Sequence, residues 1–362
     1  MELALYGPGG FFVSDGRGAG RRADFLTSPE VGPLFGAVVA RALDAEWYRL
    51  GRPDPFVLIE VGAGRGALAR AVLGAGPACS VALRYVCVER SARLRSGIEV
   101  LLPVEPAATV LGLVAFGAGA GVDDGDDDVV VAGRGPSVTV LDDVPAMAVT
   151  GMVLANELLD NLPFRLLERG DRGWLEVFVG SGDGDDFVEV LVEAPAETAA
   201  IADRLAPRAP IGARIPVQAV AGEWLAGALS VLAAGRLVVI DYADTTASLA
   251  ARPWSDWLRT YRGQGRGGAP LDDPGAQDLT CEVALDQLAR VRVPDADRSQ
   301  AEWLAAHGIE ELVAAARATW HERAGVGDLA AVAARSRVGE ADALCDPTGL
   351  GGFRVLEWVA ER

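Results

Sequence analysis

The chain has 362 residues, 33 of them Arg or Lys and 51 Asp or Glu, which gives a formal net charge of −18. A chain of this length buries a large core in one or two domains, and its charge repels nucleic-acid backbones and fits a cationic partner better. Half of the residues are hydrophobic, yet no apolar run reaches the roughly 18 residues of a membrane-spanning helix, so we expect no membrane insertion.

The N-terminal segment contains the run Thr27-Ser28-Pro29-Glu30. Its Thr and Ser can cap a helix, with the proline at the first helical position and the glutamate in the first turn, and residues 31–50 carry the amphipathic continuation. The alternative is a lid in which Asp24 and Glu30 reach over a ligand, because acidic residues on Gly-rich loops often contact ligands. The sequence leaves both interpretations open.

Residues 55–73 contain strand, turn and helix signals in immediate succession. A short apolar run predicts a buried parallel strand, Gly62, Gly64 and Gly66 predict a tight turn, and good helix formers follow. This order is typical of the ligand-binding start of a nucleotide-type α/β domain. The glycines alone allow NAD, a flavin or S-adenosylmethionine.

Two carboxylates narrow the choice of cofactor. Glu89 follows a predicted second strand over 81–88 and stands twenty-odd residues after the glycine turn, where an acid accepts hydrogen bonds from ribose hydroxyls. Glu60 lies next to the turn, where a dinucleotide site keeps the strand end apolar so that pyrophosphate can approach. An anion there favours a cationic or amine-bearing cofactor.

Further polar residues follow the next predicted strands. The acidic run at 123–128 is expected to be a solvated loop. A third strand over 138–141 ends at Asp142, where the adenine amino group of a nucleoside cofactor is usually met, and a fourth runs into Asn156 and Glu157. Because the carboxyl ends of neighbouring parallel strands line one crevice, we expect these polar strand ends to converge.

The second half of the chain mixes strand and helix patterns. Alternating runs over 164–192 predict an inserted antiparallel meander, followed by a helix over 224–232 and a main-sheet strand tipped by Asp241 and Tyr242. Residues 254–281 are expected to form a long polar loop that serves as a lid or substrate platform. Three helices, over 283–289, 301–307 and 310–323, and an edge strand over 353–359 complete the expectation.

The sequence offers few residues that could form a metal site or a hydrolase active site. The four cysteines lack CxxC spacing, and the only histidines, His307 and His321, stand in helical sequence far from the candidate site, so no metal is expected. The N-terminus has no charged leader before an apolar core, which disfavours a signal peptide. We therefore expect a cytoplasmic protein.

Five segments together carry a family likeness: DFLTSPE at 24–30, EVGAGRG at 60–66, ANELLDNLP at 155–163, IDY at 240–242 and LRTYR at 258–262. In this order they resemble the MidA-like class I S-adenosylmethionine-dependent methyltransferases. The resemblance implies an α/β fold: a Rossmann-like class I methyltransferase sheet with an inserted antiparallel β meander and helical additions. It also implies S-adenosylmethionine as cofactor and a link to arginine methylation during assembly of a respiratory complex.

The resemblance assigns roles to particular positions. The cofactor-binding residues it implies are Glu60, Gly62, Gly64, Glu89, Asn156, Thr27, Ser28 and Pro29, and the glycine turn and the end of the third strand add Gly66 and Asp142 to this set. Glu157 and Asp160 are the catalytic candidates, because an arginine acceptor needs carboxylates that hold its guanidinium group. The substrate-binding candidates are Glu30, Asp241, Tyr242, Tyr261 and Arg262.

The implied domain plan has four parts. An N-terminal loop and lid segment covers 1–55, the cofactor-binding core combines 56–163, 233–253 and 350–362, the meander and a helix cover 164–232, and a substrate loop with helices covers 254–349. The expected function is methyl transfer to an arginine of a protein, with a respiratory-complex subunit as a candidate substrate. The alternatives are a small-molecule or other protein methyltransferase, and a non-catalytic assembly factor with the same fold.

Overall fold

The computed structural model describes residues 1–14, 27–112, 130–182, 186–263 and 265–361. The predicted acidic loop at 123–128 and the lid candidate Asp24 lie outside these residues. The chain divides into two compact units: the first joins Met1–Phe25, Glu157–Gly227 and Asp241–Pro294, and the second joins Leu26–Asn156, Ala228–Ile240 and Asp295–Arg362. The four-part domain plan stays a prediction. Within the described residues, no helix has the length and apolarity to cross a membrane.

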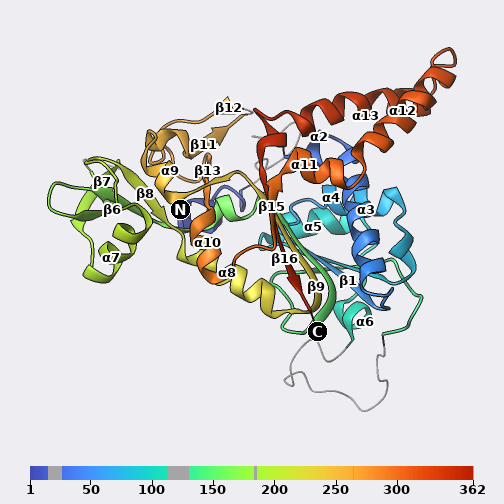
Figure 1. The fold of residues 1–362 in the computed structure, drawn as a ribbon, viewed down its shortest axis with the longest axis horizontal. Coiled ribbons are helices and arrows are strands. Elements are labelled where there is room, and N and C mark those ends of the chain that lie inside the picture. Colours follow the sequence, from blue (N-terminus) through green and yellow to red (C-terminus); the bar gives the residue numbers. More distant parts are fainter. Residues whose placement is uncertain (15–26, 113–129, 183–185, 264, 362) are drawn as a thin grey trace. The chain divides into compact units, whose positions relative to one another are not determined.

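The second unit is built around a seven-stranded sheet with the order β15-β16-β9-β4-β1-β2-β3 (Figure 1). Its strands are β1 (Phe56–Val61), β2 (Leu83–Val88), β3 (Ser137–Leu141), β4 (Val149–Asn156), β9 (Leu232–Asp241), β15 (Ala296–Ser299) and β16 (Arg354–Ala360). The five strands from β9 to β3 pair in parallel, and β15 pairs antiparallel with β16. The predicted Rossmann-like sheet is confirmed.

The helices of this unit pack on the sheet or on one another, and α12 (Ile309–Arg323) packs along α13 (Leu329–Cys345). These helices are α2 (Ser28–Val31), α3 (Pro33–Arg49), α4 (Ala67–Ala75), α5 (Ala92–Leu101), α6 (Ala107–Leu111), α11 (Gln300–Ala306), α12 (Ile309–Arg323) and α13 (Leu329–Cys345). Every residue of β1 is buried, as its apolar run predicts for a strand covered on both faces, and Phe56 and Leu58 join the main hydrophobic cluster.

The single long helix predicted after Thr27 is wrong, because two helices stand there. Gly32 is extended between α2 and α3, and Pro33 begins the second helix. The backbone N–H of Leu34 donates to Oε2 of Glu340 on α13 at 2.9 Å, which satisfies a donor at the start of α3. The break therefore depends on a partner that is distant in sequence.

The first unit contains three small sheets. The predicted meander is confirmed as a four-stranded antiparallel sheet of order β7-β6-β5-β8. Its strands are β5 (Arg165–Arg169), β6 (Trp174–Ser181), β7 (Phe187–Glu193) and β8 (Arg214–Val217). β10 (Ala243–Asp244) pairs in parallel with β14 (Val283–Ala284). The helices of this unit are α1 (Glu2–Tyr6), α7 (Ala196–Leu205), α9 (Thr246–Ala250) and α10 (Leu285–Val291), and α8 (Ala219–Ser230) leads to the second unit.

The long polar loop predicted over 254–281 is wrong. This stretch forms a three-stranded antiparallel sheet of β12 (Gly265–Arg266), β11 (Leu258–Arg262) and β13 (Asp278–Cys281). Side chains of β11 alternate between buried and more exposed positions, the period expected for a strand. Turn residues between β12 and β13 obscured this short pattern in the sequence.

Three smaller expectations are also corrected. The helix predicted over 224–232 begins at Ala219 and ends at Ser230, because β9 starts at Leu232. The helix predicted from residue 283 is preceded there by the two residues of β14. The terminal strand β16 lies inside the sheet, since β15 pairs on its outer side and forms the edge.

Candidate functional site

The strand order places a topological switch at β1. The chain proceeds from β1 to β2 and β3 on one side, and β4 then pairs with β1 on the other side. In open parallel sheets, ligands bind outside the carboxyl ends of the strands at such a switch. The end of β1 is therefore the expected cofactor position, and the end of β4 is its neighbour.

The glycine turn occupies this position. Gly62, Gly64 and Gly66 have φ values of 77°, 55° and 79°, the left-handed region in which glycine has no steric penalty. Gly66 is the N-cap residue of α4. A Cβ on Gly64 would meet no protein atom within 4 Å, so the turn presents open backbone at the strand end. This geometry fits a ligand that approaches the backbone closely.

Glu89 is fixed beside the turn. It directly follows β2, is 7% exposed, and accepts hydrogen bonds from the backbone N–H of Gly64 at 2.9 Å and of Ser91 at 2.7 Å. Burial raises the pKa of Glu89, and the two backbone hydrogen bonds oppose that shift. Because each carboxylate oxygen accepts more than one hydrogen bond, the group retains the capacity to hold ribose hydroxyls.

Glu60 lies deeper than the sequence indicated. It is the penultimate residue of β1, and its Oε2 accepts a hydrogen bond from the hydroxyl of Tyr85 on β2 at 2.7 Å. Burial raises the pKa of Glu60 to about 7; the Tyr85 hydrogen bond lowers it and the charge of Glu89 raises it. Glu60 is thus an acid that titrates near neutral pH, and a cation placed beside it would favour its ionised form.

The other cofactor candidates have varied surroundings. Asp142 follows β3 and is exposed, whereas Asn156 ends β4 and is half-buried. Thr27 is 9% exposed, and the fully buried Ser28 donates its hydroxyl hydrogen to Oε1 of Gln300 on α11 at 3.0 Å. Pro29 and Glu30 belong to α2 and are partly exposed. Their contacts with a cofactor stay predictions, and the hydroxyl of Ser28 already has a structural partner.

The first unit contains an acidic cluster made of the predicted acceptor residues. Oδ2 of Asp241 accepts from the backbone N–H groups of Leu159 and Asp160 at 3.0 and 3.3 Å, and Oδ1 accepts from the N–H of Tyr242 at 3.0 Å. The hydroxyl of Tyr242 donates to Oδ2 of Asp160. Asp160 and Tyr242 are 82 residues apart in the sequence, and the Asp241 carboxylate and the Tyr242 hydroxyl join their two segments.

The carboxyl groups of this cluster are buried. Asp160 is 4% and Asp241 is 2% exposed. Burial raises the pKa of Asp160 to about 6, although the hydrogen bond from Tyr242 lowers it. Burial also raises the pKa of Asp241 well above its usual range, and the charges of Asp160 and Glu157 add to that shift. A buried cation would relieve both effects.

Two further features of the cluster indicate a ligand. Within the described part of the chain, Oδ1 of Asp160 is buried and has no hydrogen-bond partner. Buried carboxylate oxygens are costly without a donor, so this atom fits a site for an N–H group. Glu157 adopts a φ of 52°, a backbone conformation that is rare for residues other than glycine and concentrated at functional sites.

The remaining substrate candidates belong to the three-stranded sheet. Asn161 donates to Oδ1 of Asp278 on β13 at 3.1 Å, and Asp278 pairs in register with Tyr261 on β11. Arg262 is exposed and lies 3.2 Å from a carboxylate oxygen of Asp273. The sheet thus brings Tyr261 to the strand beside Asp278, while Arg262 points to solvent and is paired there.

Sequence analysis did not select Arg259 or Asp278 for the site. The guanidinium carbon of Arg259 lies 5.5 Å from the ring centroid of Tyr242, and Asp278 is fully buried. Arg259 stands inside the LRTYR segment that supported the family likeness, which was the available signal. Asp278 is the first residue of β13, so it could have been selected only if that strand had been expected.

Comparisons with known proteins agree with this architecture. A family model described as "Putative S-adenosyl-L-methionine-dependent methyltransferase" matches residues 38–300. The mitochondrial protein arginine methyltransferase NDUFAF7 of Mus musculus is 26% identical over 311 residues, which cover 80% of this chain and 64% of the mouse protein. The same protein of Homo sapiens is 27% identical, over 75% of this chain and 59% of the human protein. This chain therefore spans about three fifths of the length of these curated relatives.

A solved structure resembles the whole chain. It is a superfamily member from Burkholderia thailandensis bound to S-adenosyl-homocysteine, with a TM-score of 0.78 and 27% identity, covering 99% of this chain and 86% of that one. The native crystal structure of a Burkholderia thailandensis protein of the same superfamily gives a TM-score of 0.75 at 26% identity. The bound molecule is the demethylated form of S-adenosylmethionine, which agrees with the glycine turn and Glu89. The chain belongs to the matched family of S-adenosyl-L-methionine-dependent methyltransferases, as the MidA-like motifs indicate.

Proposed function

We propose that this chain transfers a methyl group from S-adenosylmethionine to a guanidinium nitrogen of an arginine in a protein substrate. The observation that carries the proposal is the buried acidic cluster of Asp160 and Asp241, with Oδ1 of Asp160 unpaired among the described residues. In the chain, Glu157 and Asp241 directly follow Asn156 and Ile240, the last paired residues of β4 and β9. The acidic residues therefore begin where the sheet strands end.

The cofactor-binding part of the proposal rests on the second unit. In this proposal the glycine turn, which is open at Gly64, holds the methionine portion, and the carboxylate of Glu89, which the Gly64 N–H fixes, holds the ribose hydroxyls. Glu60, whose pKa is raised to about 7 by burial, provides a negative charge for an amine once a cation favours its ionised form. When bound, S-adenosylmethionine supplies an electrophilic methyl group on a sulfonium.

In this proposal the acidic cluster positions the guanidinium group of the acceptor arginine and takes up the proton that this group loses. Methyl transfer breaks the sulfur–carbon bond and forms a nitrogen–carbon bond, and the acceptor nitrogen loses a proton. Asp160 accepts the N–H of the guanidinium at Oδ1 and takes up that proton, because its pKa is about 6. Asp241 fixes the backbone of Asp160 through its hydrogen bond to the Asp160 N–H. Such positioning in a low-dielectric site is the main source of rate for an in-line displacement.

The names of the relatives support the substrate class. The NDUFAF7 proteins are called protein arginine methyltransferases, and the acidic cluster offers the charge that a guanidinium group needs. A respiratory-complex subunit is our candidate substrate, on the strength of the family likeness. The cytoplasmic location expected from the sequence stays part of the proposal.

The test is transfer of label from the cofactor. The purified chain is incubated with S-adenosylmethionine labelled in the methyl group and a lysate of the source cell, and labelled protein bands are hydrolysed to amino acids. We expect label in a protein band and in N-methylarginine. The Glu89→Ala variant should lose labelling, whereas Glu99→Ala, a change at an exposed glutamate of the same unit, should retain it.

Three results would contradict the proposal. Label found only in small metabolites would indicate a small-molecule methyltransferase. Label in another amino acid would indicate a different protein acceptor. A purified chain that fails to bind S-adenosylmethionine at millimolar concentration would indicate a non-catalytic protein with this fold.

A further inference from the structure

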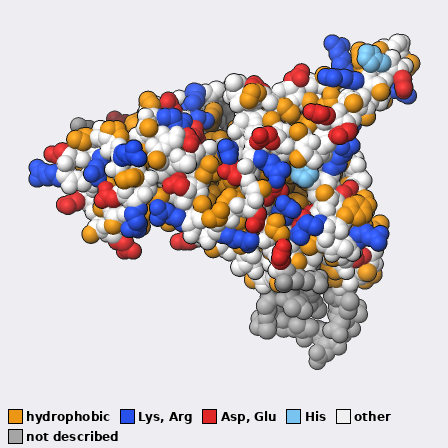
Figure 2. Space-filling model, viewed as in Figure 1, with side chains coloured by type: hydrophobic (Ala, Val, Ile, Leu, Met, Phe, Trp, Pro, Cys, Tyr) orange, Lys and Arg blue, Asp and Glu red, His pale blue; other side chains and the backbone are white. Residues whose placement is uncertain are grey.

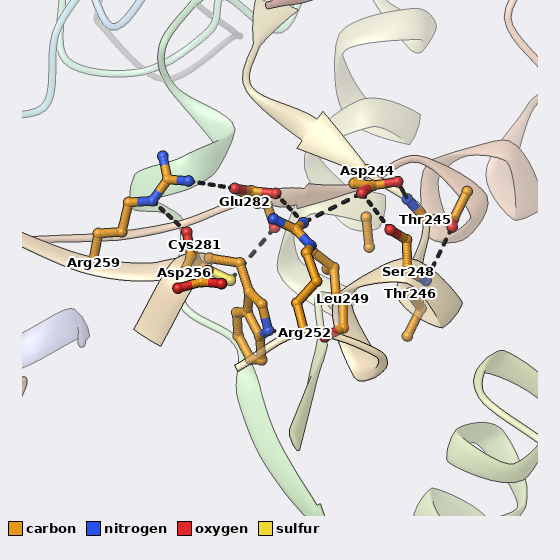
Figure 3. A network of polar contacts seen from close by, with 12 residues as sticks. Asp244, Thr245, Thr246, Ser248, Leu249, Arg252, Asp256, Arg259, Cys281 and Glu282 are labelled. Atoms are coloured by element: carbon orange, nitrogen blue, oxygen red, sulfur yellow. Dashed lines mark hydrogen bonds and ion pairs between the residues drawn. The ribbon is translucent and has the colours of Figure 1, made fainter. Parts of the chain in front are cut away.

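A chain of charged groups surrounds Glu282 in the first unit (Figure 3). Its carboxylate lies between two guanidinium groups: Oε1 is 2.6 Å from Nη2 of Arg259, and Oε2 is 2.6 Å from Nη2 of Arg252. Arg252 also lies 3.3 Å from Oδ2 of Asp244. On its other side, Nε of Arg259 donates to the backbone oxygen of Asp256 at 2.6 Å. The guanidinium of Arg259 is therefore held at two points.

Glu282, which anchors the guanidinium group of Arg259, is itself held in place by hydrogen bonds. Glu282 is 7% exposed, its backbone N–H donates to the carbonyl oxygen of Trp257 at 2.9 Å, and its own carbonyl oxygen accepts from Nε2 of Gln218 at 3.0 Å. The Arg259 side chain, held by Glu282 and Asp256, has therefore already lost its rotamer freedom on folding. The fixed guanidinium is thereby pre-organised for a further contact.

That contact is with Tyr242. The guanidinium carbon of Arg259 lies 5.5 Å from the centroid of the Tyr242 ring, within the range of a cation–π interaction. The hydroxyl of the same ring donates to Oδ2 of Asp160. A cation over a phenol ring stabilises electron density on the ring and so makes the hydroxyl a stronger donor. Arg259, Tyr242 and Asp160 thus form one connected series.

We propose that Arg259 is a positioning residue of the acceptor site, which acts through Tyr242 to orient the Asp160 carboxylate and to favour its charged form. The inference rests on the proposed function, because the role of Asp160 as acceptor of the guanidinium proton belongs to that proposal. It adds a residue that touches neither cofactor nor substrate in the proposed arrangement. Glu282 and Arg252 complete the support behind it.

The electrostatics of Asp160 agree with this role. The groups that face it are the hydroxyl of Tyr242, the carboxyl of Asp241 and the thiol of Cys281, and Glu157 acts on Asp241. Burial raises the pKa of Asp160, and the hydrogen bond from Tyr242 lowers it. Loss of Arg259 weakens that hydrogen bond, so the pKa of Asp160 should rise.

The experiment measures the pKa of Asp160 directly, by carbon-13 NMR of the side-chain carboxyl in the full chain, with the resonance assigned by its loss in Asp160→Asn. In Arg259→Gln we expect the pKa of Asp160 to rise by up to about half a unit, because only part of the cation–π energy reaches the carboxylate through the Tyr242 hydroxyl. Arg169→Gln is the matched control, because the Arg169 guanidinium lies 5.3 Å from the Trp174 ring and pairs with Asp203 at 2.9 Å. It should leave the pKa of Asp160 unchanged.

A double-variant cycle shows whether Arg259 acts through the hydroxyl. Tyr242→Phe removes the hydroxyl, so adding Arg259→Gln to that variant should produce no further rise in the Asp160 pKa. Equal, additive shifts would overturn the inference. If Arg259→Gln does not fold, Glu282→Gln leaves the arginine and loosens its anchor, and a smaller rise is expected.

The outcomes separate this inference from the proposed function, because the NMR measurement needs no activity. An unshifted Asp160 in a folded Arg259→Gln chain overturns the inference even where wild-type protein methylates arginine. A shifted Asp160 in a chain that binds no S-adenosylmethionine overturns the proposed function alone. In active protein, the acid limb of the kcat profile should move to higher pH in Arg259→Gln and stay in place in Arg169→Gln.

Discussion

The hydroxyl of Tyr85 donates a hydrogen bond to Oε2 of Glu60 at 2.7 Å, between two neighbouring strands of the central sheet. Burial raises the pKa of Glu60 to about 7, although the hydrogen bond from Tyr85 lowers it, and Glu60 is the penultimate residue of the first strand. It links the cofactor proposal to a measurable property, since a group that titrates near neutral pH makes binding depend on pH.

Cofactor affinity should fall as the pH falls below about 7. In the free protein Glu60 is protonated below its pKa, and a cationic amine of the cofactor favours the ionised form, so binding there must release a proton. Glu60→Gln should bind more weakly at high pH and lose this pH dependence. Isothermal titration calorimetry in buffers of different ionisation enthalpy counts the released protons. Glu99→Gln, at an exposed position, serves as the control, and an unchanged pH dependence in Glu60→Gln would contradict the assignment.

Glu60 should also make the stability of the folded protein depend on pH, with stability falling as the pH rises. The pKa of Glu60 is raised from 4.5 in the unfolded reference to about 7 by burial, so its favourable contribution is present below 4.5 and is lost as the pH rises through 7. The free energy of unfolding of Glu60→Gln minus that of wild type should therefore be larger, by about 2 kcal/mol, at about pH 8 than at about pH 5, because only wild type loses stability as the pH rises. Denaturant titrations at the two pH values measure this difference. A difference of the opposite sign would show that Glu60 folds as a carboxylate.

Glu89→Ala should weaken S-adenosylmethionine binding by about 10- to 100-fold, because charge-assisted hydrogen bonds contribute about 1.5–3 kcal/mol each. The change also leaves the backbone N–H of Gly64 without its 2.9 Å acceptor. Glu89→Gln keeps an acceptor for the ribose and should lose less affinity. Equilibrium dialysis with labelled cofactor measures both variants, and unaltered affinity in Glu89→Ala would remove Glu89 from the cofactor site.

Gly235→Ala should destabilise the protein strongly. Gly235 has a φ of 139°, and a Cβ there would lie 1.8 Å from the backbone oxygen of Gly151 on the neighbouring strand, which cannot move without breaking the sheet. We expect a loss of about 3 kcal/mol or more, or failure to fold. The control is Gly74→Ala in α4, where the added Cβ meets nothing within 4 Å and a small gain from helix propensity is expected. Thermal denaturation of the two variants measures the difference in their stability. Equal melting temperatures would contradict the close approach of the two strands at Gly235.

Much of the fold could be predicted from the sequence because the strands of the central sheet are apolar and buried. The run at 56–59 predicts β1, and the acid after 81–88 correctly places Glu89 directly after β2. The meander was predicted for a different reason, because alternation over several residues is a strong local signal. Each of these elements is determined by its own residues.

The expectations that were wrong depend on distant partners. The break at Gly32 is stabilised by Glu340, some 300 residues further along the chain, and β11 is recognisable only through its pairing with β13. Glu60 was expected to be an anion because the sequence does not show that it is buried within the sheet, where the Tyr85 hydroxyl of the neighbouring strand donates to it. Arg259 was passed over because its contact with Tyr242 joins two segments that only the fold brings together.

In the proposed reaction Asp160 binds the arginine side chain that is methylated, so Asp160→Asn should nearly stop the reaction. The measurement is the rate of N-methylarginine formation with labelled S-adenosylmethionine, compared among wild type, Asp160→Asn and Asp203→Asn, the last a change at an exposed aspartate of the same unit.

We expect Asp160→Asn to lower kcat by about 100- to 10,000-fold, the usual contribution of a positioned general base, while cofactor affinity and the Asp203→Asn rate stay within about twofold of wild type. A folded Asp160→Asn variant that forms N-methylarginine at the wild-type rate would contradict the proposed role of Asp160.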